Sequence, residues 1–118
     1  MLWQVDPTSS MPLHVQVAAC VRREMGAGRL ERGDRLPSAK EVAGVLDVNL
    51  HTVLRAYQSL RDEGLIDLRR GRGAVVTATD PAGDARLGSL VADLVAEARL
   101  TGTTRHDLTR LIESEFQR

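Results

Sequence analysis

The sequence predicts a mainly α-helical chain with one small β-hairpin, followed by a two-helix C-terminal tail. Apolar residues recur at helical spacing in several separate segments, and two short β-prone runs flank residues 71–73. Glycine and proline residues occur in the stretches between these segments and mark the ends of the helices and strands. A chain of 118 residues is long enough for one compact domain and a small appendage.

Charge is unevenly distributed, although the formal net charge is zero. The segment from Pro12 to Ala78 carries 11 basic and 8 acidic residues, and the segment from Thr79 to Arg118 carries 5 basic and 7 acidic ones. Because local patches rather than total charge attract an anionic ligand, the first segment is compatible with a nucleic-acid partner. Aromatic residues make up only 3% of the chain, so the core must consist of Leu, Val and Ala, and dimerisation would add to its modest stability.

Neither export nor membrane insertion is expected. No apolar run approaches the roughly 20 residues of a membrane span, and the start MLWQVDPTSS lacks the basic and apolar regions of a signal peptide. Cys20 is the only cysteine, which excludes an intramolecular disulfide, and its place in a helical apolar pattern predicts a buried small hydrophobic residue. A reducing cytoplasm is the expected compartment.

The chain is expected to begin with an irregular arm, residues 1–11. Pro12 suits the first turn of a helix, which Gly26 and Gly28 end. Trp3, the only tryptophan, is expected to pack, either on its own domain or on a partner subunit.

After a turn that contains glycine and proline, two further helices follow in close succession. Ser38 caps the first of them, and Glu41 completes the capping-box pattern S-x-x-E. Asp47–Val48 forms a tight turn, and Asn49 is the N-cap of a helix that runs to about Glu63. Two helices joined by so short a turn predict a helix-turn-helix.

The runs LIDLRR (65–70) and GAVVTAT (73–79) predict a hairpin with an arginine- and glycine-rich tip. Three helices and a hairpin in this order describe a winged helix-turn-helix, whose third helix enters the DNA major groove while the hairpin follows the backbone or minor groove. Asn49, His51 and Thr52 then lie at the entrance of the reading helix, where Asn can bond base edges and Thr can bind phosphates. Capping and solubility alone also explain this cluster.

Residues 1–78 are thus the expected DNA-binding domain, residues 79–84 a linker, and residues 85–118 a two-helix tail. An apolar stripe runs from Leu87 to Ala98, and a second one follows a break at Thr101–Gly102. A packed three-helix domain leaves these stripes without a partner, which favours a dimer surface over an intrachain lid. The expected dimer residues are Leu87, Leu90, Val91, Leu94, Val95, Leu108, Leu111 and Ile112.

The stretch from Pro12 to about Val76, over half of the chain, resembles the DNA-binding domain of GntR-type bacterial transcription regulators. Its markers are the motifs GDRLPS (33–38), TVLRAY (52–57), EGLI (63–66) and RRGRG (69–73), which are highly specific in combination. The resemblance implies a dimeric repressor or activator that binds inverted repeats. The short tail, with the T-V-x-R-A-Y pattern, is similar to the YtrA-type subgroup, whose tail mainly dimerises.

The resemblance also implies which residues contact DNA. They are Arg35, Ser38, Lys40, Asn49, His51, Thr52, Arg55, Arg70, Gly71 and Arg72. Arg35 resembles a phosphate contact or a structural anchor, and Ser38 is first an N-cap and second a phosphate ligand. Lys40 stands where the family usually has an arginine. A lysine can still contact a guanine or a phosphate, but it lacks the bidentate fork.

Two leucines of the third helix depart from the family pattern. Leu50 replaces a frequent arginine or proline, and Leu54 replaces a residue that is often polar or basic. Leu50 either touches a thymine methyl group or faces solvent. These departures bear on the target sequence, and they also admit an alternative function as a winged-helix protein-interaction module. The arginine-rich hairpin tip favours phosphates instead.

The sequence predicts no enzyme, no cofactor and no metal site. His14, His51 and His106 are scattered over three predicted helices, and a single cysteine cannot build a thiolate cluster. A metal held by His106 with Asp107 and Glu113 is disfavoured because Asp107 is needed as a cap.

The predicted function is a homodimeric, sequence-specific transcription regulator, with repression favoured over activation. It would bind double-stranded DNA at an inverted-repeat operator, engage no membrane, and lie on the nucleoid when bound. Release by a small-molecule effector is compatible with this function.

Overall fold

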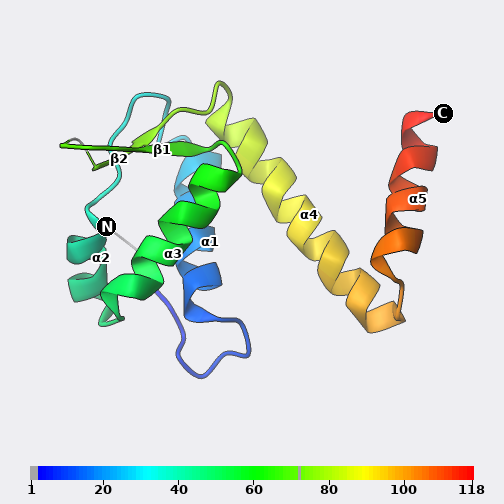
Figure 1. Cartoon of the computed structure of the whole chain (residues 1–118), viewed down its shortest axis with the longest axis horizontal. Helices are drawn as coiled ribbons and strands as arrows, with labels where there is room; N and C mark the ends of the chain where they lie inside the picture. The colour runs from blue at the N-terminus through cyan, green and yellow to red at the C-terminus, as the bar shows by residue number, and fades with distance from the viewer. Residues whose placement is uncertain (1–2, 72) are drawn as a thin grey trace. The chain divides into compact units, whose positions relative to one another are not determined.

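The computed structural model describes residues 3–71 and 73–118, and it confirms a mainly helical chain with one two-stranded hairpin (Figure 1). The chain consists of two compact units, Met1–Arg86 and Leu87–Arg118. The elements in order are α1 (Leu13–Gly26), α2 (Ala39–Leu46), α3 (Leu50–Asp62), β1 (Ile66–Arg69), β2 (Gly73–Val76), α4 (Pro81–Thr101) and α5 (Arg105–Phe116). Among the described residues, no helix is both long and apolar enough to cross a membrane.

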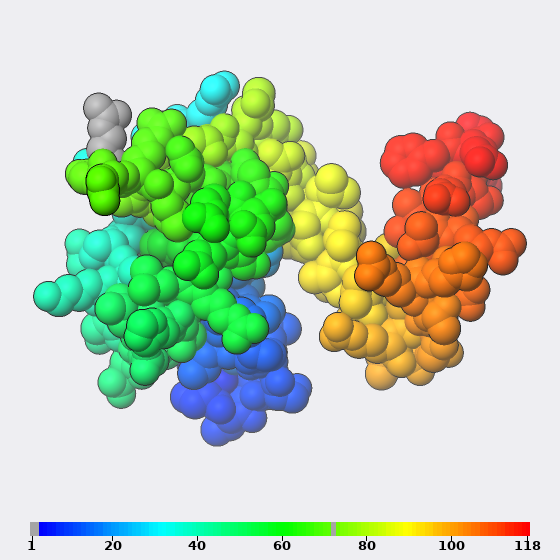
Figure 2. All heavy atoms as spheres, viewed as in Figure 1, coloured from blue at the N-terminus to red at the C-terminus, as the bar shows by residue number. Residues whose placement is uncertain are grey.

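The predicted caps of α2 and α3 are confirmed. The Ser38 hydroxyl accepts a hydrogen bond from the Glu41 N–H at 3.1 Å, and the Asn49 side chain accepts one from the His51 N–H at 2.8 Å. Between the two helices, Asp47 adopts the left-handed conformation with φ 53°, which ends α2 abruptly. The space-filling view shows α2 packed against α3, as expected for a helix-turn-helix (Figure 2).

The hairpin of β1 and β2, here called the wing, pairs Ile66 with Val76 and Arg69 with Gly73. The turn before α2 also joins this sheet, which the sequence did not predict. Arg35 bridges to Val75, and the Leu36 N–H donates to the Ala74 carbonyl at 2.9 Å. The wing is therefore hydrogen-bonded to the segment that leads into α2, and its position relative to the helix-turn-helix is set by backbone hydrogen bonds.

The core lies mainly between α1 and α3, which pack face to face. Cys20 is buried in it, as predicted, and Trp3 is buried in the same cluster, so the N-terminal arm packs on its own domain. Gln16 holds the arm in place. Its side chain accepts from the Asp6 N–H at 2.7 Å and donates to the carbonyl oxygens of Asp6 and Met11 at 2.9 and 2.8 Å.

The expected linker, residues 79–84, is helical from Pro81 onward. The Asp80 side chain accepts a hydrogen bond from the Gly83 N–H at 3.0 Å, and Ala85 is buried in the core of the first unit. An Asp followed by Pro is a common helix start, because proline fits the first helical position and the carboxylate caps it. The sequence therefore contained the signal for this helix start, although a linker was predicted there.

In the second unit, Thr104 caps α5 by accepting from the Asp107 N–H at 3.1 Å. Thr101 is the last residue of α4, and Gly102 follows it with φ 71°. No residue of α5 is buried.

Candidate nucleic-acid interface

The N-terminal turn of α3 presents a group of polar side chains. His51 is exposed and Thr52 is half-buried. The carbonyl oxygen of the Asn49 side chain is engaged as the cap, which leaves its amide NH2 group as a donor. The cap and a base contact are therefore compatible, because they use different atoms of Asn49.

Further candidate residues lie on the segments beside this turn. Lys40 is exposed on the first turn of α2, and Arg35 is exposed although its backbone is paired with Val75. The backbone of Arg35 is anchored in the sheet, and no salt bridge to its guanidinium is found among the described residues, so both roles expected for Arg35 stay open. Ser38 is exposed at the N-cap of α2.

Arg55 lies farther along α3, near His14 of α1. Partial burial, and secondarily the charge of Arg55, lowers the pKa of His14 below its ordinary value. His14 is consequently more neutral near pH 7 than a free histidine, and Arg55 supplies the positive charge at this place.

The wing tip carries adjacent arginines in different surroundings. Arg69 contacts Asp67, with 3.4 Å between its Nε and a carboxylate oxygen. Among the residues described, no carboxylate forms a salt bridge with Arg70. Gly71 has φ 79°, a conformation that glycine adopts without strain. The predicted contact at Arg72 lies outside the described residues.

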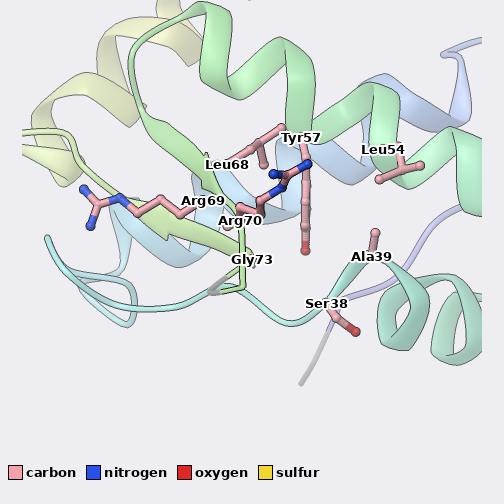
Figure 3. Close-up of a pocket in the computed structure, with 9 residues that line it drawn as sticks. Ser38, Ala39, Leu54, Tyr57, Leu68, Arg69, Arg70 and Gly73 are labelled. Atoms are coloured by element: carbon pink, nitrogen blue, oxygen red, sulfur yellow. The ribbon is translucent and has the colours of Figure 1, made fainter.

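A shallow pocket of about 450 Å³ lies between α2, α3 and the wing (Figure 3). It is lined by Ser38, Ala39, Leu54, Tyr57, Leu68, Arg69, Arg70, Gly73 and Ala74. Figure 3 shows the Arg70 side chain directed toward Tyr57, whereas the Arg69 side chain points away. The pocket brings Ser38 and Arg70, both predicted from the sequence, to one place.

Sequence reasoning did not identify Leu68 as part of this site. The sequence did contain a signal for Leu68. Residues of a strand alternate between two faces, so Ile66 and Leu68, two positions apart, lie on the same face of the strand. Ile66 is buried, yet Leu68 is 37% exposed, although Ala74, its partner in the hairpin, is buried. No group of three or more His, Cys, Asp or Glu side chains that could hold a metal was found in the part of the chain that the structure describes.

The second unit carries the candidate dimer residues. Most of them are exposed apolar side chains: Leu87, Leu90, Val91, Leu94, Leu111 and Ile112. Val95 and Leu108 are half-buried. Phe116, at the end of α5, is 87% exposed and extends the apolar character of this unit.

The chain is similar in sequence to curated transcription regulators. It is 33% identical over 109 residues to the HTH-type transcriptional regulator Rv1152 of Mycobacterium tuberculosis, covering 92% of this chain and 89% of that protein. It is 38% identical over 74 residues to the HTH-type transcriptional repressor YtrA of Bacillus subtilis, a match that spans 63% of this chain and only 57% of that repressor.

Similarity to a solved structure and to a family model agrees with these matches. The structure of YtrA from Sulfolobus acidocaldarius, a GntR-family transcription factor, superposes with a TM-score of 0.62 at 32% identity, over 81% of this chain and 99% of that one. Residues 13–76 match the family model described as "Bacterial regulatory proteins, gntR family", which is more than half of the chain. With its helix-turn-helix and wing, the chain therefore belongs to the GntR family of DNA-binding bacterial transcription regulators.

Proposed function

We propose that this regulator acts as a homodimeric repressor that reads an inverted-repeat operator. The observation that carries the proposal is the exposed N-terminal turn of α3, where His51 stands beside the cap Asn49, with exposed Lys40 on α2. In a winged helix-turn-helix this turn is the part that reaches base edges in the major groove. The wing arginine Arg70 would contact the backbone.

The predicted contacts divide into base-reading and phosphate-binding residues in this proposal. Lys40, His51 and the free amide of Asn49 would read bases. Phosphates would be bound by the remaining members of the predicted set: Arg35, Ser38, Thr52, Arg55, Arg70 and Arg72. Gly71 would let the wing backbone approach the DNA closely.

Dimerisation would use the apolar side chains of residues 85–118. Leu87, Leu90 and Val91 are each at least half exposed, which is costly for large apolar residues grouped within one short helical segment. A second copy would cover them and place the two reading helices about one helical turn of DNA apart. Residues 1–78 would then be the DNA-binding part and α4 the connection to the dimer surface.

The test is a binding selection with purified protein and random or genomic DNA, followed by sequencing of the retained fragments. An enriched inverted repeat supports the proposal and identifies the operator.

Light scattering of Leu90→Glu, with Ser89→Glu as a control on the same helix, tests the dimer surface. Only the Leu90 variant should become monomeric, because it places a charge within the apolar interface. A monomeric wild-type chain would contradict dimerisation.

Repression is proposed on the similarity to a protein named as a repressor. A reporter gene placed behind the selected operator should become more active when the regulator is deleted, and a loss of activity would indicate an activator instead.

A small-molecule effector is a further proposal. A thermal shift with a metabolite should then coincide with release of the operator.

A docking module for another protein is the second candidate, because Leu50 and Leu54 of α3 are 42% and 38% exposed. A docking helix would bind its partner with weak salt dependence. Phosphate contacts release counterions, so DNA binding should weaken steeply as salt rises. An absence of sequence enrichment, together with a confirmed dimer, would favour the docking module or an effector that licenses binding.

A further inference from the structure

We propose that the pocket between α2, α3 and the wing holds one deoxyribose-phosphate unit of the DNA backbone, and that its leucine wall distinguishes deoxyribose from ribose. This inference rests on the proposed DNA-reading function. It assigns a role to Leu54 and Leu68, which no base or phosphate contact explains.

The wall of the pocket is apolar and accessible. Leu54 and Leu68 are 38% and 37% exposed, although both lie beside residues that are proposed to bind DNA. Ala39 and the buried Tyr57 and Ala74 complete the apolar lining. Apolar surface that remains exposed and lines a concave site commonly marks a place where a ligand is bound.

The rim of the pocket is polar and cationic. The Ser38 hydroxyl accepts a bond from the Glu41 N–H, which leaves its own proton free to donate. Arg70 is directed toward Tyr57, whereas Arg69 points away and pairs with Asp67 (Figure 3). An apolar wall beside a cationic rim complements a nucleotide backbone, in which an apolar sugar face adjoins a phosphate.

The elements that border the pocket also place it on the path of the DNA. Leu54 is three residues after His51 and therefore lies on nearly the same side of α3, one turn farther along. Ser38 and Arg70 border the pocket from α2 and from the wing. A backbone contacted by the reading turn, by α2 and by the wing would pass across this pocket.

Sugar discrimination follows from the missing polar partners. The Tyr57 hydroxyl already donates to the Pro37 carbonyl at 2.7 Å, and in this proposal the donors of Ser38 and Arg70 are engaged by the phosphate. A 2′-hydroxyl pressed against Leu54 and Leu68 would lose water without gaining a partner, which is unfavourable. The 2′-hydroxyl is also the group by which proteins distinguish RNA from DNA.

The experiment measures affinity for the selected operator duplex after one deoxynucleotide at a time is replaced by its ribonucleotide. At the backbone position in the pocket, we expect affinity to fall on the order of tenfold. Leu68→Thr, which adds a hydroxyl group to the wall, should remove most of that penalty at the same position only. Leu54→Ser is the second variant, and thermal unfolding verifies that both remain folded.

Two controls separate this role from general effects. Val45→Ser changes an apolar residue of α2 that is 63% exposed but does not line the pocket, so the ribose penalty should persist. Arg70→Ala should reduce the slope of log affinity against log salt by about 0.9 and leave the penalty in place. A ribose penalty that no leucine variant alters, on a duplex that binds normally, would overturn this inference alone. Failure to bind the all-deoxy duplex would overturn the proposed function as well.

Discussion

The hydroxyl of Tyr57 donates a hydrogen bond to the backbone carbonyl of Pro37 at 2.7 Å. This bond joins the middle of α3 to the residue just before the N-cap of α2. The Tyr57 ring is almost completely buried, and it also forms part of the pocket beside the wing. One side chain thus connects the core, the start of α2 and the surface proposed to face DNA.

Tyr57→Phe is expected to lower the free energy of unfolding by about 1 kcal/mol, because the Pro37 carbonyl loses its partner while the ring remains packed. Urea unfolding, followed by circular dichroism, measures the loss. Gln58→Ala, at the exposed neighbouring position, is the matched control and should change stability little. Equal stability of Tyr57→Phe and the wild type would mean that the bond contributes nothing.

Alkaline pH should destabilise the wild type more than Tyr57→Phe. Burial, and secondarily the charge of Glu41, raises the pKa of Tyr57 above its ordinary value. Stability from a raised folded-state pKa is fully present below the unfolded value, about pH 10, and is lost as pH rises toward the folded value. Urea titrations from about pH 9 to about pH 11 should therefore show the difference. Because Tyr57 is the only tyrosine, its phenolate absorbance should appear only as the chain unfolds.

Gln16→Ala should release the N-terminal arm from α1, because three hydrogen bonds to the backbone of Asp6 and Met11 are lost. We expect a stability loss of about 1 kcal/mol, since these groups are accessible to water. Trp3 is the only tryptophan, so its fluorescence should shift to longer wavelength under native conditions. An unshifted emission would show that burial of Trp3 holds the arm without Gln16.

Replacement of Gly44 by alanine should stabilise the chain, whereas replacement of Gly83 should not. At Gly44, a Cβ would meet nothing within 4 Å, so Gly44→Ala should stabilise α2 by about 0.5–1 kcal/mol. At Gly83, a Cβ would overlap an Asp80 carboxylate oxygen, so the cap must move. Gly83→Ala should therefore gain nothing or lose stability, as thermal unfolding would show. Equal stabilisation by both substitutions would mean that the Asp80 cap is not needed.

His51→Ala and Arg70→Ala should affect DNA binding in different ways. A base contact at His51 would change the ranking of operator variants, whereas a phosphate contact at Arg70 would weaken binding to all sequences nearly uniformly. Competition binding with the operator, single-base variants and random DNA distinguishes these patterns. Identical losses on every duplex for both variants would remove the reading role assigned to His51.

Local signals predicted much of this molecule. Ser38, Asn49 and Thr104 cap helices because their side chains bond backbone N–H groups only two or three residues away. The alternation and glycine content of residues 65–79 similarly predicted the hairpin. Such features depend on neighbouring residues, so a sequence window contains the whole interaction.

Features that join distant segments were decided by the tertiary structure. Arg35 pairs with Val75, which lies about forty positions farther along the chain. Nothing in the turn chemistry of GDRLPS indicates a strand partner. The pocket arises because α2, α3 and the wing meet, so that Leu68, Leu54 and Ser38 all line it. The sequence by itself determined the helices, their caps, the hairpin and the family. Only the folded chain decided that the arm packs on its own core and that two leucines line one surface with a serine and an arginine, because such contacts depend on long-range packing rather than on local spacing.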